Sequence, residues 1–475
     1  MKNFSLFLLL FLIFFLTTVI RVIPDGFHPD SLVYMSMASN LANGSSSFWN
    51  LNFTDTLFHP FYEHPPLGIF IMSLPFYIFG NTLVIDKLFG VVFAILLALI
   101  ISSIIGLITK EHQKNTLLLS LFYFLAFPIV GNTFENNLLE IPATFFILLS
   151  VYIFLKYVQT LQQTTFYSFT FTLALLAAFL VKGPVMIFTF ALPFFYFLLF
   201  SKKYSFKAML QFYAFVLLFA ILFASILYLY SPSNLYLGTY FENQVLNSIN
   251  GSRGGDEHFK LTKQLLIDFA SIFFISYILI SIRAKKFIKL KFTNYFWLFI
   301  LIGLSGSLPL EISPRQHDYY IFPSLAFFAT ALGIIFTREI TILMKKLYDL
   351  KAIHFLNIIL IIAVGVISFE KYNSNSRYKN FYADFISAKV KIVKSSKIET
   401  CTDNAIDYDK IHQNIGLTAN LKRYYNAELT DKDNDAQYYL TTTNSIKSCE
   451  PDKEKYLYIG AKEPKYYLLY KAVKN

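Results

Sequence analysis

Apolar segments separated by two kinds of short polar loop make up the chain from Met1 to about residue 370. One kind of loop is mainly basic, as around Lys110, Lys202 and Arg283. The other kind is rich in Asp, Glu, His and Pro, and its members include 24-PDGFHPDS-31, 59-HPFYEHPPL-67 and 311-EISPRQHDYY-320. Because basic loops stay on the cytoplasmic side of a membrane, this alternation predicts a bland inner face and an outer face that carries the reactive side chains.

Composition agrees with a membrane protein. Hydrophobic residues make up 55% of the chain and charged residues only 15%, whereas a soluble domain has about 25% charged residues. The sequence therefore predicts an all-α multispanning membrane protein. The net charge of +11 is explained by the inner loops and by anionic lipid, so we expect no nucleic-acid partner.

A helix needs about 20 apolar residues to cross a bilayer. Eleven segments approach this length, and we expect about 11 to 13 transmembrane helices. The first segment is interpreted as a retained span because no small-residue cleavage site follows it. The predicted spans are 4–22, 86–109, 116–131, 141–157, 166–181, 184–200, 208–230, 264–283, 292–309, 319–337 and 352–369.

The apolar run 66–80 is the ambiguous segment, since it is short and contains Pro75. If it crossed the membrane, the basic loops at Lys110 and Lys202 would lie outside, against the positive-inside rule. We therefore expect an interfacial or re-entrant helix within a long first outer loop, roughly residues 23–85.

The chain changes character near residue 370. Residues 371–475 are polar, contain no span, and lie outside if the number of preceding spans is odd. The segments 437–443, 455–461 and 465–473 are β-prone. We predict a transmembrane domain over 1–370 and a small extracytoplasmic α/β domain over 371–475. Its two cysteines, Cys401 and Cys449, either pair in an oxidising compartment or both stay unpaired.

Several charged side chains stand at the predicted outer surface. Asp30 opens an amphipathic helix over 29–44, where it serves either as an N-cap or as a functional carboxylate. Glu63 and His64 precede two prolines that force an extended chain. Glu63 is a candidate base or metal ligand and His64 a candidate phosphate or proton carrier, against the alternative of solvated loop residues.

Later loops add further candidates. Glu140 lies at the outer mouth of a span, and Lys182 lies between two apolar runs, where it either holds a lipid phosphate or snorkels to the surface. Asp256, Glu257 and His258 are within reach of a metal, although their spacing is not that of a zinc site.

Arg315, His317 and Tyr320 form the last group, at the entry to a late span, and are candidate phosphate contacts. Carboxylates and cations beside lipid suit a substrate with a lipid tail, an anionic head and a group to transfer. A carboxylate accepts the proton of the attacking group, and cations stabilise the phosphate that leaves.

These motifs occur together in a recognisable order. Asp30 is followed by 62-YEHPPL-67, 138-LLEIP-142, 181-VKGP-184, a His-containing loop at 242–259, and 319-YYIFP-323. Over residues 1–370 the chain resembles the GT-C glycosyltransferases of the protein O-mannosyltransferase and aminoarabinose transferase (ArnT) type. The resemblance implies an inverting transfer from a polyprenyl-phosphate sugar to a lipid, glycan or protein acceptor, outside the cytoplasm.

The resemblance also implies roles for single residues. Asp30 would activate the acceptor, and Glu140 matches the second acidic position. Lys182 and Arg315 would hold the donor phosphate, together with the residues already named for that contact, His64, His317 and Tyr320.

Metal binding is a further implication of the resemblance. Glu63 and His258 match positions associated with a divalent metal ion in the aminoarabinose branch. That branch has Lys where this chain has His64, which argues against aminoarabinose as the donor sugar.

Two other functions fit part of the pattern. One is a related ligase that moves a whole oligosaccharide, and the other is a transporter or flippase of a lipid-linked sugar. A transporter is expected to carry ionisable groups in mid-span and inverted repeats. The predicted spans are almost free of charge at their centres, which favours the enzyme.

Overall fold

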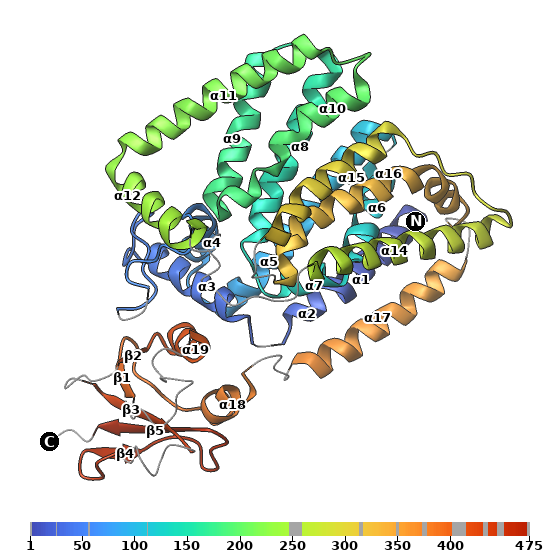
Figure 1. Cartoon of the computed structure of the whole chain (residues 1–475). Coiled ribbons are helices and arrows are strands. Elements are labelled where there is room, and N and C mark those ends of the chain that lie inside the picture. Colours follow the sequence, from blue (N-terminus) through green and yellow to red (C-terminus); the bar gives the residue numbers. More distant parts are fainter. Residues whose placement is uncertain are drawn as a thin grey trace. The chain divides into compact units, whose positions relative to one another are not determined.

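The computed structural model describes residues 2–24, 26–55, 58–111, 113–246, 259–312, 317–347, 351–372, 378–400, 415–430, 436–443 and 451–472. The chain forms two compact units (Figure 1). The membrane unit comprises Met1–Ile23, Tyr62–Gly68 and Asp86–Phe369, and the tail unit comprises Pro24–Phe61, Ile69–Ile85 and Glu370–Asn475. Most of the first loop thus belongs with the C-terminal segment, which the sequence did not indicate.

Most of the described residues as far as Tyr372 are in helices, with an irregular segment between Ala42 and Leu67. The helices, in chain order, are α1 (Lys2–Phe14), η1 (Phe15–Val19), α2 (Ile20–Val22), α3 (Pro29–Ala42), α4 (Leu67–Phe79), α5 (Leu83–Thr109), α6 (Gln113–Leu125), α7 (Pro128–Glu135), α8 (Glu140–Thr160), α9 (Thr164–Lys182), η2 (Pro184–Met186), η3 (Phe188–Ala191), α10 (Leu192–Phe200), α11 (Phe206–Leu229), α12 (Ser231–Tyr240), η4 (Phe241–Leu246), α14 (Lys260–Ala284), α15 (Asn294–Ser307), η5 (Leu308–Ile312), η6 (Asp318–Ile321), α16 (Phe322–Leu347) and α17 (Lys351–Tyr372).

Within the described residues, seven helices are long and apolar enough to cross a membrane. This confirms the multispanning all-α class, while the expected total of about 11 to 13 spans stays a prediction. The seven are Leu83–Thr109, Glu140–Thr160, Thr164–Lys182, Phe206–Leu229, Lys260–Ala284, Asp318–Ile342 and Ile353–Tyr372.

An eighth span is formed if α6 and α7 are counted together, but the two helices meet at an angle of 88°. The sequence had indicated one helix over 116–131, which is wrong. Phe127 precedes Pro128 and has an extended backbone, with ψ of 121°. Because a residue before proline is driven out of the helical region, the helix breaks there and α7 starts afresh.

Helix α4 covers the ambiguous run and is 13 residues long, with Pro75 inside it. At 1.5 Å per residue it measures about 20 Å, whereas the hydrocarbon core is about 30 Å thick. Its length agrees with an interfacial or re-entrant helix. Its C-terminal end exposes Tyr77, Ile78 and Phe79.

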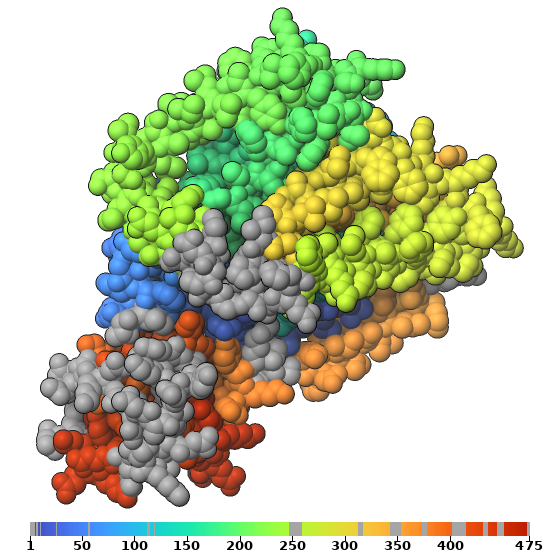
Figure 2. All heavy atoms as spheres, viewed as in Figure 1, coloured from blue at the N-terminus to red at the C-terminus, as the bar shows by residue number. Residues whose placement is uncertain are grey.

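Burial within the membrane unit differs from helix to helix. α16 is buried along almost its whole length, whereas α11 and α17 are mostly exposed. Figure 2 shows the side chains of α11 and α14 on the surface of one face. Their exposed residues are mainly Leu, Ile and Phe, as expected of surfaces that contact lipid. α16 is therefore central to the membrane unit, while α11 and α17 have largely exposed apolar surfaces.

The tail unit contains a five-stranded sheet in the order β2-β1-β3-β5-β4. β1 is parallel to β2 and β3, and β5 is antiparallel to β3 and β4. With α18 (Lys379–Phe381), η7 (Tyr382–Ser387) and α19 (Ile415–Tyr425), this confirms the small α/β domain. The strands are β1 (Lys397–Thr400), β2 (Glu428–Thr430), β3 (Tyr438–Thr442), β4 (Tyr456–Tyr458) and β5 (Tyr467–Ala472).

Helix α3 is packed against α19 in the same unit. Residues 31–39 are buried without interruption, so the amphipathic helix expected at this position is wrong. The capping residue is also a correction: His28 is the N-cap, and its Nδ1 accepts a hydrogen bond from the backbone N–H of Asp30 at 3.3 Å. Asp30 stands one residue after Pro29, inside the first turn.

Two polar clusters hold the tail unit together. The guanidinium of Arg423 donates to Asn81 Oδ1 at 2.6 Å and to the Thr82 carbonyl at 3.2 Å, and lies 5.3 Å from the centre of the Phe76 ring. The buried carboxylate of Asp384 accepts hydrogen bonds from three consecutive backbone N–H groups, at residues 465, 466 and 467. Cys401 and Cys449 lie outside the described residues.

Candidate active site

A buried ion pair in the membrane unit joins two of the predicted site residues. Glu140 is the first residue of α8 and Lys182 the last residue of α9. The two helices are joined by a three-residue connection and pack side by side, so the hairpin brings its two ends together. The Lys182 ammonium donates to Glu140 Oε1, and the side chains are 9% and 0% exposed.

The motif 181-VKGP-184 ends α9 abruptly after Lys182. Gly183 has φ of +87°, and a Cβ atom there would stand 1.9 Å from the Tyr240 hydroxyl. Only glycine therefore fits, both for its backbone conformation and for its contact with Tyr240. The Tyr240 hydroxyl lies 3.5 Å from the Lys182 carbonyl and donates to it. The Lys182 side chain is thus fixed by both the helix end and its surroundings.

Two tyrosines of η6 complete the surroundings of the lysine. The Lys182 ammonium lies 5.6 Å from the ring centres of Tyr319 and Tyr320, within the range of a cation–π contact. His317 stacks on Tyr319, with ring centres 5.2 Å apart, and meets Tyr320 edge-on at 5.3 Å. The structure therefore places Lys182, His317 and Tyr320 in one cluster, as expected from the sequence.

Glu63 and His64 lie against the segment that follows α11. The Gln244 side-chain amide donates to the Glu63 carboxylate, and the Tyr236 hydroxyl donates to the His64 carbonyl at 3.0 Å. Tyr236 and Tyr240 are one helical turn apart in α12, so one helix contacts both groups of site residues. Burial raises the pKa of both tyrosine hydroxyls, which keeps them protonated and able to donate.

Asp30 belongs to the tail unit, where its side chain is 41% exposed and its Oδ2 lies 3.7 Å from His28 Nδ1. Asp256, Glu257, His258 and Arg315 lie outside the described residues.

The metal site expected at Glu63 and His258 stays a prediction, because His258 lies outside the described residues. The Gln244 amide donates to one oxygen of the Glu63 carboxylate. Among the residues that the structure describes, no three His, Cys, Asp or Glu side chains are grouped as metal ligands. We therefore derive no step that depends on a metal.

Sequence reasoning missed three members of the site. Tyr319 was noted only as a neighbour of Tyr320, and neither Tyr240 nor Gln244 was singled out. Tyr240 is one of 32 tyrosines and carries no local signal. Its importance follows only from its contact with Gly183, 57 residues earlier in the chain.

The arrangement is suited to holding an anion. A lysine ammonium buried beside one carboxylate and two aromatic rings lies in surroundings of low polarity, where its attraction for a phosphate is stronger than in water. The tyrosine and histidine groups nearby provide hydrogen-bond donors for the same anion.

Comparison with known proteins agrees with a site that holds an anion. Residues 63–229 match the family model described as dolichyl-phosphate-mannose-protein mannosyltransferase. The matched segment includes Glu63, Glu140 and Lys182. No sequence among curated proteins matches significantly.

Two solved structures have the same fold over nearly their whole length. The chain is similar to ArnT from Cupriavidus metallidurans bound to undecaprenyl phosphate, with a TM-score of 0.63, 11% identity, and coverage of 98% of this chain and 97% of that one. The apo state of the same protein gives a TM-score of 0.62, 12% identity and the same coverage.

The chain has a GT-C fold like that of ArnT, with several helices long and apolar enough to cross a membrane. The family model that matches residues 63–229 covers less than half of the chain. The similarity runs through the C-terminal segment as well, since 98% of the chain is covered.

Proposed function

We propose that the protein transfers a single sugar from a polyprenyl-phosphate donor to a lipid, glycan or protein acceptor on the outer side of the membrane. The observation that carries the proposal is the buried Lys182 ammonium, held by Glu140 and faced by Tyr319 and Tyr320. The structural neighbour with undecaprenyl phosphate bound supports the choice of donor.

In the proposed reaction, an acceptor hydroxyl or amine attacks the anomeric carbon of the donor sugar. The new bond forms as the bond from that carbon to the phosphate oxygen breaks, and polyprenyl phosphate leaves with the electron pair. The acceptor proton passes to a carboxylate, for which the resemblance suggests Asp30. Attack opposite to the leaving group inverts the configuration at the anomeric carbon.

Lys182 acts on the leaving group. Its ammonium offsets the negative charge that grows on the bridging phosphate oxygen, which is the type of stabilisation that contributes most in enzymes that act on phosphates. Glu140 touches Lys182 rather than the substrate in this scheme, so it is a positioning residue and not the second catalytic carboxylate. Tyr320 and His317 supply hydrogen bonds to the phosphate oxygens, and we give His64 no role beyond the carbonyl contact to Tyr236.

The outer location rests on charge distribution. The basic loops at Lys110, Lys202 and Arg283 favour the cytoplasm. The connection that follows α8 leads into the N-terminal end of helix α9, and Lys182 stands at the C-terminal end. This C-terminal end is the outer one if Lys202 is inside. In a bacterium the membrane would be the inner membrane, with the site and tail unit facing the periplasm.

Turnover by the purified full chain in nanodiscs tests the proposal. The probes are synthetic polyprenyl-phosphate monosaccharides, and the measurement is release of polyprenyl phosphate in the presence of an envelope extract that contains acceptors. We expect release by the intact protein, loss with Asp30→Asn, and unchanged release with the matched exposed variant Asp452→Asn. Mass spectrometry of the extract then identifies the sugar and the acceptor.

Other results would contradict parts of the scheme. Normal release by Asp30→Asn removes Asp30 from the mechanism. If the intact protein in liposomes moves the donor between leaflets without consuming it, the protein is a transporter or flippase. Transfer of a whole oligosaccharide from a pyrophosphate carrier would instead identify a ligase.

A further inference from the structure

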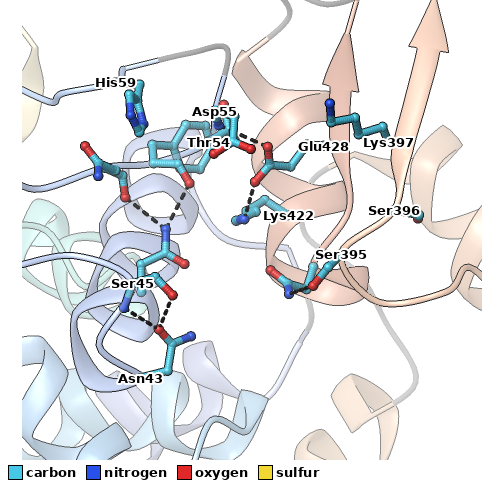
Figure 3. A pocket seen from close by; sticks show the side chains of 14 residues that line it. Asn43, Ser45, Thr54, Asp55, His59, Ser395, Ser396, Lys397, Lys422 and Glu428 are labelled. Atoms are coloured by element: carbon cyan, nitrogen blue, oxygen red, sulfur yellow. Dashed lines mark hydrogen bonds and ion pairs between the residues drawn. The ribbon is translucent and has the colours of Figure 1, made fainter. Parts of the chain in front are cut away.

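The tail unit contains a polar cavity whose function is unassigned. Its volume is about 280 Å³, and fourteen residues line it. They come from the end of α3 and the following loop, from the segment before β1, and from α19 and β2 (Figure 3). All of these segments belong to the tail unit. The cavity is therefore a feature of one compact unit and is separate from the Lys182 site.

Most of the lining residues have side chains that can both donate and accept hydrogen bonds. Four asparagines, three serines and one threonine contribute to it. Phe53 is the single aromatic residue in the lining and is itself fully buried. The walls thus offer little surface for an acyl chain or an apolar peptide side chain, and they suit a ligand with many hydroxyl groups.

The charges in the lining balance. Lys422 donates to Glu428 Oε1 at 2.5 Å, and Glu428 Oε2 accepts from the backbone N–H of Asp55 at 3.0 Å. The other lining charges are one lysine, Lys397, and the Asp55 carboxylate. Two cations against two carboxylates favour a ligand without net charge over a phosphate or a polyanion.

The cavity is shaped by hydrogen bonds within the protein. The Asn40 amide donates to the carbonyls of Asn52 and Phe53 at 2.9 and 3.0 Å, which fixes the loop after α3. Asn43 Oδ1 accepts from the Ser45 hydroxyl at 2.6 Å. Figure 3 shows these bonds on one side and the Lys422–Glu428 pair on the other. Walls fixed in advance lose little freedom when a ligand binds.

One carboxylate in the lining is accessible to a ligand. Asp55 lines the cavity and is exposed. A carboxylate accepts hydrogen bonds at both of its oxygens, so Asp55 can bind ligand hydroxyls.

We propose that this cavity binds an uncharged carbohydrate. Its volume is at the lower end of the range of small-molecule pockets, about 300–1,000 Å³, and matches a unit of monosaccharide to disaccharide size. The ligand hydroxyls donate to the Asp55 carboxylate and accept from the lysine and asparagine donors. The proposal stands apart from the transfer reaction and does not require it.

Saturation-transfer NMR with the full chain in nanodiscs tests the proposal. The probes are neutral mono- and disaccharides as free sugars, the same sugars as glycolipid headgroups, and sugar phosphates of matched size. We expect binding of the neutral free sugars, and weakening by about three- to tenfold when Lys397→Met removes one hydrogen bond. The matched control is Lys391→Met, since Lys391 is exposed and does not line the cavity.

Asp55→Asn is a second variant that leaves the fold intact. It keeps the backbone N–H that binds Glu428, and Asp55 is exposed, so a folding defect is not expected. Weakened sugar binding by this variant supports the proposal. The proposal is overturned if no neutral sugar binds the intact chain, if sugar phosphates bind in preference, or if Lys397→Met and Asp55→Asn both bind like the intact chain. Binding of the glycolipid headgroup alone would assign the cavity to membrane glycolipid rather than to free glycan.

Discussion

Two lysine–glutamate pairs, one in each unit, make the same contact in different surroundings. In the membrane unit, Lys182 and Glu140 come from the ends of two long helices and meet among aromatic rings. In the tail unit, Lys422 and Glu428 are six residues apart and meet between α19 and β2, beside amides and hydroxyls. The first pair presents a cation that an anionic ligand can share. In the second pair, the Glu428 carboxylate also accepts the Asp55 N–H, and the pair forms part of the cavity wall.

The role of a buried charge pair depends on the groups that surround it. A pair among rings gains little from hydrogen bonds to the protein, so it is costly to bury and is more reasonably explained by function. A pair that also accepts a backbone N–H and lies between a helix and a strand is explained by structure alone. The predictions below separate these two roles, beginning with the largest expected effect.

Glu140→Gln should destabilise the protein most. It leaves the Lys182 cation buried without its carboxylate, which costs about 3–5 kcal/mol. The measurement is thermal unfolding of the full chain in detergent, with exposed Glu370→Gln as the matched control. An unfolding temperature equal to that of the control would show that Lys182 finds another partner or loses its proton.

Lys182→Met should abolish transfer while Lys182→Arg retains part of it. Removing one group that stabilises developing charge typically costs a factor of about 10²–10³ in kcat, or about 2.7–4 kcal/mol. The assay is release of polyprenyl phosphate, and exposed Lys207→Met is the control. If Lys182→Met keeps more than a tenth of the activity, the cation is not the contact for the leaving phosphate.

Glu428→Gln should loosen the tail unit by about 1.5–3 kcal/mol, since two hydrogen bonds to a charged group are weakened. The readout is protease cleavage of the intact chain within residues 370–475. The two pairs have different structural roles if Glu428→Gln becomes sensitive to protease in the tail and Glu140→Gln does not. Equal sensitivity in both variants would mean that the pairs play the same structural role.

The smallest effect concerns pH. Burial, with the Glu399 carboxylate nearby, raises the pKa of Tyr439 to about 12. In the unfolded chain the pKa is about 10, so the stabilising contribution is complete below pH 10 and is lost as pH rises from 10 towards 12. Tyr439→Phe should unfold at a temperature that falls less between pH 9 and 11 than that of the intact chain or exposed Tyr372→Phe. Parallel curves would show that Tyr439 does not contribute.

Sequence patterns located the parts of the fold that local chemistry determines. The β-prone segments 437–443, 455–461 and 465–473 indicated β3, β4 and β5, and all three are confirmed. β1 and β2 are only four and three residues long, so no local signal marked them. The break before Pro128 has a local cause in the proline, although the apolar run hid it.

The candidate site likewise contains some residues that the local sequence identified and others that it did not. Glu140 and Lys182 were each identified from their position at a span end, but their pairing depends on α8 and α9 having nearly equal lengths, which uncertain helix boundaries obscure. His317 and Tyr320 were identified from their neighbours in sequence. Tyr240 was not, because its role depends on a contact with the glycine that ends another helix. The capping role passed from Asp30 to His28 because Pro29 occupies the first helical position.

The burial of α3 against α19 has a consequence for how the protein is made. Residues 31–39 leave the ribosome long before residues 415–425, which cover them. At about 5–20 residues per second, the apolar surface of α3 waits for tens of seconds before its covering helix is synthesised. A nascent chain that stops near residue 370 never receives that cover. Chaperones or proteases should therefore bind the first loop of such truncated chains. The stability of the first hundred residues thus depends on the last hundred.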